Sequence, residues 1–123
     1  PANQRTSIYH DGTQIPMVMQ IKWTKRALNR LESSINYCQR NFGERVATKY
    51  YQKVKRHTSL LVNNPHLGKI EHTLFSKHTY EYRSLVVHPY FKLIYYINVN
   101  KERIVITNLW DVRQEPDKLT KQN

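Results

Sequence analysis

Two amphipathic helical patterns, joined by only a few residues, constrain the fold of this chain more than any other feature. In the first, apolar side chains recur at spacings of three and four, at Leu28, Leu31, Ile35, Cys38 and Phe42. The second repeats this spacing at Ala47, Tyr50, Val54, Thr58 and Leu61. Such spacings place the side chains on one stripe of a helix, and the short joint predicts an antiparallel helical hairpin. Each stripe requires a partner surface to cover it.

The helix ends carry recognisable signals. Thr24 offers an N-cap hydroxyl for the first helix, which we expect to end around 41–43 at a glycine. We expect the second helix to run from about Glu44 until Asn63-Asn64-Pro65 interrupts it. Cys38 lies on the apolar stripe of the first helix, where it is predicted to pack as a small hydrophobic residue.

The expected partner surface is a sheet. Met19, Ile21 and Trp23 alternate with polar residues, as in a strand with one buried face. After the helices we expect a weak strand at 70–75, then strands at 80–87, 91–99 and 103–110, with a break at His88-Pro89-Tyr90 and a turn at 100–102. The prediction is an α+β domain in which the helical hairpin packs on a twisted, mainly antiparallel sheet of four to five strands.

The chain length of 123 residues fits one domain, which we place at 17–123. Residues 1–16 are expected to be an N-terminal extension whose origin the sequence leaves open, because Met17 and Met19 are both suitable translation starts. That extension contains Asp11-Gly12, a preferred hairpin turn pair, so a small hairpin is predicted there.

The charge balance favours an acidic partner. The chain has 20 Lys and Arg against 9 Asp and Glu, a net charge of +11, and ten of the basic residues lie between Lys22 and His57. Exposed members of this cluster, including Arg26, Arg30, Lys49 and Lys53, are candidate binding residues. A like-charged helical face can also serve solubility alone.

Several classes of function have little support. The single cysteine and six dispersed histidines do not form a metal-ligand pattern, three scattered glycines do not form a phosphate-binding loop, and no apolar run is long enough to span a membrane. We therefore expect a cytoplasmic protein that uses no metal or cofactor and does not bind membranes.

Basic and aromatic chemistry remains. Arg83 and Lys92 lie on neighbouring predicted strands and Arg113 follows the last one, so the three side chains are candidates to converge at one side of the sheet. Clustered cations would bind a phosphodiester and stabilise the charge that develops during its cleavage. Tyrosines such as Tyr90 could stack on bases, although tyrosine is also a favoured strand residue.

The block from Tyr82-Arg83-Ser84-Leu85 through 91–96 and 104–106 to 109–116 resembles the core strands of the RelE/ParE superfamily of toxins from bacterial type II toxin-antitoxin systems. The resemblance covers roughly residues 19–119. It implies a toxin subunit that arrests growth and is neutralised by a cognate antitoxin. It also implies an α+β fold of the predicted kind.

RelE-like members cleave mRNA in the ribosomal A site with basic residues and a C-terminal tyrosine. The resemblance implies phosphate-binding roles for Arg83, Lys92 and Arg113. Glu81 stands where a basic residue would be expected, and Leu119 stands about where the tyrosine would be. Glu81 is the alternative candidate for a general base.

ParE-like members lack that nuclease set and are associated with poisoning of DNA gyrase. The Arg-Gln-Glu-Pro ending at 113–116 looks closer to this branch, which we place slightly ahead. Its contact surface would comprise the basic helices and the segment from Asp111 onward, with Tyr90, Trp110 and Arg113 as binding residues. The expected antitoxin segment is acidic. A basic module that binds nucleic acid without chemistry is the alternative from another class.

Overall fold

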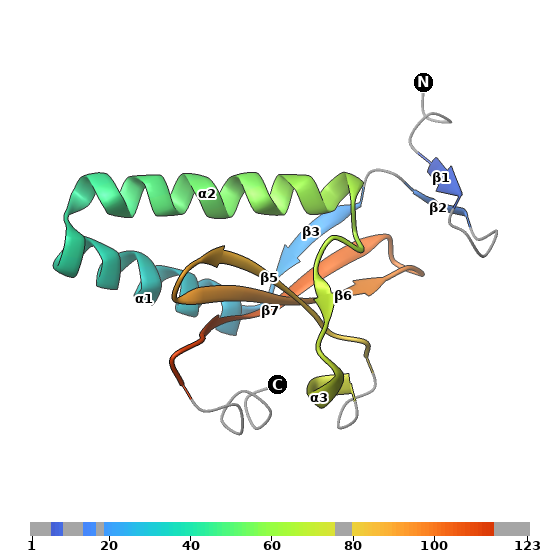
Figure 1. Cartoon of the computed structure of the whole chain (residues 1–123). Helices are drawn as coiled ribbons and strands as arrows, with labels where there is room; N and C mark the ends of the chain where they lie inside the picture. The colour runs from blue at the N-terminus through green and yellow to red at the C-terminus, as the bar shows by residue number, and fades with distance from the viewer. Residues whose placement is uncertain (1–5, 9–13, 17–18, 76–79, 115–123) are drawn as a thin grey trace.

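The structure, a computed structural model, describes residues 6–8, 14–16, 19–75 and 80–114. Its centre is a sheet of five strands in the order β3-β7-β6-β5-β4, with helices α1 and α2 on one side (Figure 1). Strand β3 (Gln20–Trp23) runs parallel to β7 (Arg103–Asp111), and the other neighbours are antiparallel. The predicted α+β architecture is confirmed.

The helical hairpin forms as the sequence predicts. Helix α1 (Lys25–Phe42) starts at Thr24, whose hydroxyl accepts a hydrogen bond from the Ala27 backbone N–H at 3.1 Å. Gly43 ends α1 with φ at +92°, a conformation that favours glycine, and α2 (Glu44–Asn63) follows at once. The joint therefore has a single residue between the helices.

The buried stripe of α1 matches the predicted one in part. Cys38 is buried and Leu31 and Ile35 pack against the core, as predicted, whereas Leu28 and Phe42 are about half exposed. The other buried side chains of this helix are Ala27 and Ser34. The reason is that α1 packs on both α2 and β7, so its buried face lies between two partner surfaces. The stripe of α2 is as predicted at Ala47, Tyr50, Val54 and Leu61, with Thr58 half-buried.

The strands after the helices differ from prediction mainly at their ends. The predicted strand at 70–75 is wrong beyond Ile70, because β4 (Lys69–Ile70) gives way to a short helix, α3 (His72–Phe75). Strand β5 (Arg83–His88) begins three residues later than predicted. Strand β6 (Phe91–Asn98) and β7 lie within one residue of the predicted bounds, and the turn at Pro89-Tyr90 joins β5 to β6.

Both faces of the sheet carry buried apolar side chains. The larger cluster lies between the sheet and the helices and includes Tyr50, Val54, Leu93, Tyr95 and Ile104. A smaller cluster of Tyr82, Ile94 and Trp110, with Tyr96 against it, lies on the opposite face. We call these the helix face and the outer face.

A bulge in β7 connects the sheet to the start of α1. The register of β6 with β7 shifts between Ile94 and Tyr95, which leaves Thr107 without a paired residue. The carbonyl of Thr107 accepts a hydrogen bond from the Thr24 hydroxyl at 3.2 Å. The residue that caps α1 is thereby held against the strand next to β3.

The N-terminal hairpin is also confirmed. Strand β1 (Thr6–Ile8) pairs antiparallel with β2 (Gln14–Pro16), while the predicted turn at Asp11-Gly12 lies outside the described residues. Among the described residues, no helix is long and apolar enough to cross a membrane.

Candidate functional site

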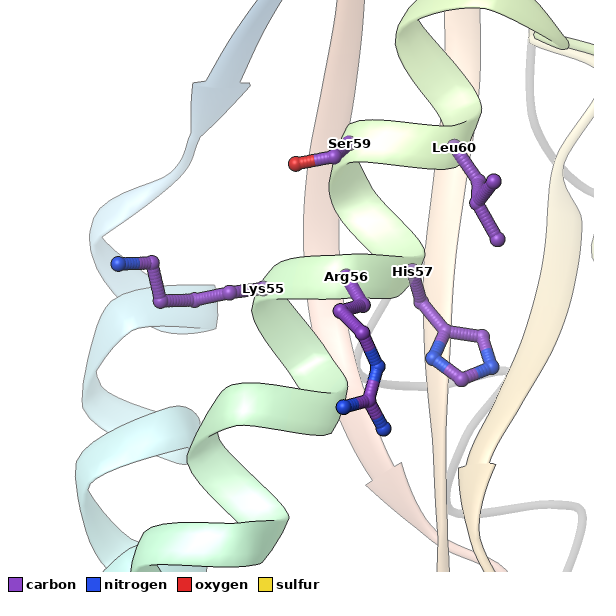
Figure 2. Close-up of a pocket in the computed structure, with 5 residues that line it drawn as sticks. All are labelled: Lys55, Arg56, His57, Ser59 and Leu60. Atoms are coloured by element: carbon purple, nitrogen blue, oxygen red, sulfur yellow. The ribbon is translucent and has the colours of Figure 1, made fainter.

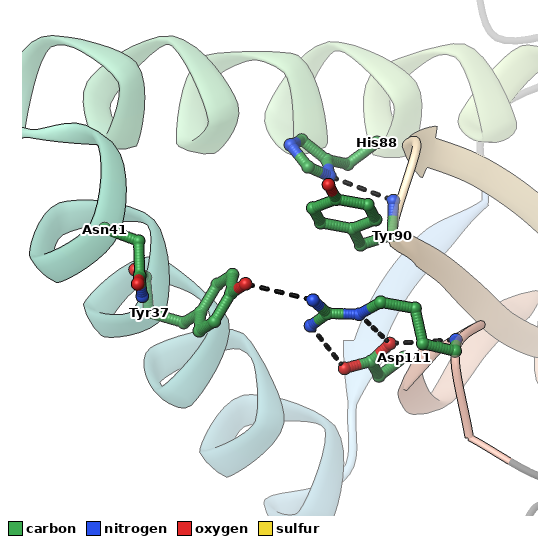
Figure 3. A network of polar contacts seen from close by, with 6 residues as sticks. Tyr37, Asn41, His88, Tyr90 and Asp111 are labelled. Carbon is green, nitrogen blue, oxygen red and sulfur yellow. Dashed lines mark hydrogen bonds and ion pairs between the residues drawn. The ribbon is translucent and has the colours of Figure 1, made fainter.

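Arg113 is held in a polar and aromatic cluster where β7 ends beside α1. Its guanidinium donates to both carboxylate oxygens of Asp111, at 2.9 and 2.7 Å, and to the Tyr37 hydroxyl at 2.9 Å. The same group lies over the rings of Tyr90 and Tyr37, 4.3 and 5.0 Å from their centroids. Figure 3 shows how Tyr37 from α1, Tyr90 from the β5–β6 turn and Asp111 from β7 approach one another. We call Arg113, Asp111, Tyr37 and Tyr90 the arginine clasp.

Contacts within the arginine clasp stabilise the charged forms of both Asp111 and Arg113. Hydrogen bonds and charge from Arg113 lower the pKa of Asp111 despite its partial burial. The hydrogen bonds to Asp111 and Tyr37 raise the pKa of Arg113. Both groups are therefore charged at neutral pH.

A shallow pocket of about 170 Å³ adjoins the clasp between α1 and the end of β7. Arg30, Ser33 and Tyr37 line it from the helix, and Leu109 and Asp111 line it from the strand. Its mixture of cation, hydroxyl and carboxylate suits polar contacts with a protein segment better than enclosure of an apolar ligand.

His88 lies next to the clasp at the end of β5. Its Nδ1 accepts a hydrogen bond from the Tyr90 backbone N–H at 3.0 Å, which requires an unprotonated Nδ1. Burial lowers the pKa of His88, and the charges of Lys53 and Arg113 lower it further. His88 is thus within electrostatic reach of both α2 and the clasp.

The second predicted cation, Lys92, is paired on the outer face. Its Nζ lies 2.9 Å from Oε2 of Glu71, and the Ser84 hydroxyl donates to the same oxygen. The side chains of Lys92 and Glu71 are 18% and 17% exposed, so solvent screens this pair only in part. Burial would raise the pKa of Glu71, but the Ser84 and Lys92 hydrogen bonds and nearby positive charge together lower it.

Arg83 supports the loop before β4 and contacts Glu81. Its guanidinium donates to the Gly68 carbonyl at 2.8 Å and to the His66 carbonyl at 3.4 Å. The remaining terminal nitrogen lies 3.4 Å from Oε1 of Glu81, whose side chain is exposed. Glu81, the candidate base, is therefore the partner of a candidate phosphate ligand.

The predicted convergence of the three cations is wrong. Arg83 pairs with Tyr95 across β5 and β6, while Lys92 pairs with Val86. These two pairs are an odd number of residues apart along each strand, so they point to opposite faces. Arg113 shares the helix face with Arg83 but lies beside Tyr90, which is five residues, or about 17 Å of extended chain, from Tyr95, the residue opposite Arg83.

The other predicted binding residues fall into two groups. Arg26, Lys49 and Lys53 are exposed on the helices, and Arg30 is half-buried beside the pocket. Trp110 is only 3% exposed in the outer-face cluster, so it does not lie on the surface where we predicted a contact. Leu119 and the segment beyond Gln114 lie outside the described residues.

Sequence reasoning missed the partners of the cations: Tyr37, Glu71 and Asp111. Tyr37 lies off the apolar stripe of α1, which is a signal that it has another role, but its partner is 76 residues away. Glu71 follows a strand too short for its neighbours to be predicted. Asp111 lies two residues before Arg113, a spacing that allows the side chains to meet after a strand ends.

Two solved structures of toxin-antitoxin proteins have a similar fold. The chain aligns with a structure described as "Chromosomal ParDE TA system from P. aeruginosa" at a TM-score of 0.61 and 19% identity, over 77% of this chain and 97% of that one. It aligns with "YoeB/ParE toxin from Agrobacterium tumefaciens" at 0.52 and 13%, over 76% and 98%. These similarities define the fold as that of the RelE/ParE toxins. No curated protein matches the sequence.

The sequence identifies the family more closely. The model of the family described as "ParE toxin of type II toxin-antitoxin system, parDE" matches residues 21–116, from β3 to just beyond the arginine clasp. The chain belongs to this ParE toxin family. It is the toxin component of a type II toxin-antitoxin system, and it therefore has an antitoxin as partner.

Proposed function

We propose that this toxin arrests growth by inhibiting DNA gyrase through protein contact, and that it does not cleave ribosome-bound mRNA. One observation carries the proposal. Each predicted phosphate ligand is paired with a carboxylate, as Arg83 with Glu81, Lys92 with Glu71 and Arg113 with Asp111. A cation whose hydrogen-bond donors and charge are satisfied by a neighbouring carboxylate binds a phosphodiester weakly.

The placement of these cations supports the same conclusion. Metal-independent cleavage of RNA requires an acid, a base and cations around one phosphate. Here Lys92 lies on the outer face of the sheet and the two arginines lie on the helix face, at separate positions. No pair of the three is arranged to hold the same phosphate.

The arginine clasp is the proposed centre of the gyrase contact. Arg and Tyr are the residue types that most often dominate the energy of protein interfaces. Arg113 and Gln114 are exposed, Tyr37 and Tyr90 are half-buried, and the adjoining pocket can receive a side chain from the partner. The clasp holds these groups rigidly before binding, which lowers the entropic cost of forming the interface.

The antitoxin is proposed to be an acidic segment that lies over the helices and the sheet edge in the cytoplasm, where it folds as it binds. The net charge of +11 supports this proposal, because it complements an acidic chain.

Two assays of the purified toxin separate the candidate targets. The gyrase proposal predicts that the toxin blocks supercoiling of relaxed plasmid by gyrase and leaves mRNA intact in a translation extract. Cleavage of mRNA at ribosomes, with supercoiling unaffected, would overturn it.

Variants make the test specific to the site. Arg113→Ala should raise the toxin concentration needed for half-inhibition at least about tenfold, as expected for an interface anchor. Lys101→Gln is the matched control, because it also removes one positive charge but lies in the exposed turn between β6 and β7, away from the clasp. It should leave gyrase inhibition within about twofold of wild type.

A further inference from the structure

We propose that α2 carries a separate binding surface for the sugar-phosphate backbone of a double-helical nucleic acid. The surface is a row of four exposed basic side chains, Arg45, Lys49, Lys53 and Arg56, which we call the basic stripe. Gln52, also exposed, lies on the same side of the helix. The inference concerns a second ligand of the toxin and does not rest on the proposed gyrase target.

The spacing of the basic stripe follows from helix geometry. Its members are four, four and three residues apart, so they lie in one row about 16 Å long. The buried residues Ala47, Tyr50, Val54 and Leu61 occupy a different side of α2, which packs on the sheet. Figure 2 shows the other basic residue of this region, Lys55, pointing away from Arg56.

The charges of the basic stripe are not compensated within the described part of the chain. The three ion pairs there are those of Arg83, Lys92 and Arg113, and the one acidic residue of α2 is Glu44 in its first turn. Like charges four residues apart repel one another and destabilise a helix. A bound polyanion would relieve this repulsion. The phosphate backbone of a nucleic acid is such a polyanion.

The composition of the stripe distinguishes among polyanions. Recognition of a peptide on a helix relies on apolar anchors, and binding of single strands relies on aromatic side chains that stack on bases. The basic stripe has neither, since its members are basic or amide residues. Two exposed apolar residues of α2 flank the ends of the stripe, Val46 beside Arg45 and Leu60 four residues after Arg56, and Tyr51 lies near Lys55 on another side.

A row of positive charge without aromatic side chains is the composition of a contact with the phosphate backbone, which carries no sequence information. Lys and Arg neutralise phosphates, and an amide such as Gln52 donates to phosphate oxygens. The surface should therefore bind duplexes with little sequence preference. DNA and RNA duplexes share this chemistry, and the experiment below separates them.

The test is fluorescence anisotropy of the purified full chain with labelled duplex DNA, duplex RNA and single-stranded DNA, each of about 20 nucleotides per strand, and with a poly-glutamate peptide. The stripe variant carries Arg45→Gln, Lys49→Gln, Lys53→Gln and Arg56→Gln. The control variant removes the same charge from exposed positions off the stripe, with Lys22→Gln, Lys25→Gln, Arg40→Gln and Lys55→Gln.

Four phosphate contacts predict that wild-type affinity for DNA duplex falls about 100-fold between 50 and 200 mM salt. The stripe variant should bind at least about tenfold more weakly at the lower salt concentration and lose most of this dependence, while the control keeps it. If duplex RNA binds more tightly than duplex DNA, RNA is the preferred ligand of the basic stripe.

Three results would overturn the proposal: equal losses in both variants, tighter binding of single strands than of duplexes, or tighter binding of poly-glutamate than of duplexes. Thermal unfolding of each variant checks the fold, and Lys49→Gln with Lys53→Gln replaces the stripe variant if that one does not fold. Gyrase inhibition by the same proteins is measured in parallel. Because duplex binding does not depend on gyrase inhibition, the failure of one proposal can be distinguished from the failure of the other.

Discussion

Arg83 and Lys92 lie on adjacent strands of the sheet and point to opposite faces. Arg83 reaches the Gly68 carbonyl on the helix face, and Lys92 reaches Glu71 on the outer face. The pairing register between β5 and β6 sets this arrangement, since an odd offset along a strand reverses the direction of a side chain. The two cations therefore stabilise different parts of the fold and cannot share a ligand.

Tyr95 should be a strong determinant of stability. Its buried hydroxyl donates to the Pro65 carbonyl and accepts from the Gly68 N–H, both at 2.8 Å. Tyr95→Phe leaves both backbone groups without this partner and should lower the free energy of unfolding by about 1–3 kcal/mol, measured by urea denaturation. Tyr51→Phe, on an exposed ring, should change it by less than about 0.5 kcal/mol. Equal effects would contradict the role of the Tyr95 hydroxyl.

Glu71 should make the stability depend on pH in the acid range. Because its pKa is lowered in the folded protein, the unfolded chain binds more protons there, and the Glu71 contribution is lost as pH falls below its ordinary value of 4.5. Glu71→Gln should be less stable than wild type at pH 7 in urea denaturation. The difference in free energy of unfolding between wild type and variant should narrow as the pH falls through the pKa of Glu71 in the folded protein. A difference that does not depend on pH would contradict this role of Glu71.

His88 should titrate below its ordinary value of 6.5, because burial and the charges of Lys53 and Arg113 disfavour its protonated form. A lowered pKa means that folding stability decreases as pH falls below 6.5. NMR titration of the ring protons measures this pKa directly. Lys53→Gln should raise it toward 6.5, whereas Lys55→Gln, which removes a charge from another side of α2, should change it less. A larger change in the His88 pKa from Lys55→Gln than from Lys53→Gln would show that Lys53 is not the nearer charge.

Lysine should not replace Arg113. The planar guanidinium donates to both Asp111 oxygens and the Tyr37 hydroxyl while stacking on two rings, and an ammonium group cannot do this. Arg113→Lys should therefore weaken gyrase inhibition nearly as much as Arg113→Ala, although the charge is kept. Arg40→Lys, at an exposed position of α1, should leave inhibition at the wild-type level. Full activity of Arg113→Lys would show that charge alone suffices.

The helical hairpin and the three long strands were predictable because their signals are local. Thr24, Gly43 and the break after Asn63 act through hydrogen bonds and backbone preferences within a few residues. The short elements β4 and α3 were not predictable, since β4 depends on its pairing with β5 and α3 has only four residues, too few to show a helical period. The exposed positions of Leu28 and Phe42 were also missed, because two packing partners rotate the buried side of α1 away from the simple apolar stripe.

The sequence by itself determined the two-layer fold, the positive charge and the resemblance to the ParE toxins, because periodicity, composition and short motifs are properties of the chain. Tertiary structure decided which charges meet. The strand register separated Arg83 from Lys92, and packing of α1 against the end of β7 brought Tyr37 to Arg113 across 76 residues. Such contacts depend on strand register and helix rotation. A register shift of one residue, or rotation of a helix by a fraction of a turn, would give these side chains different partners.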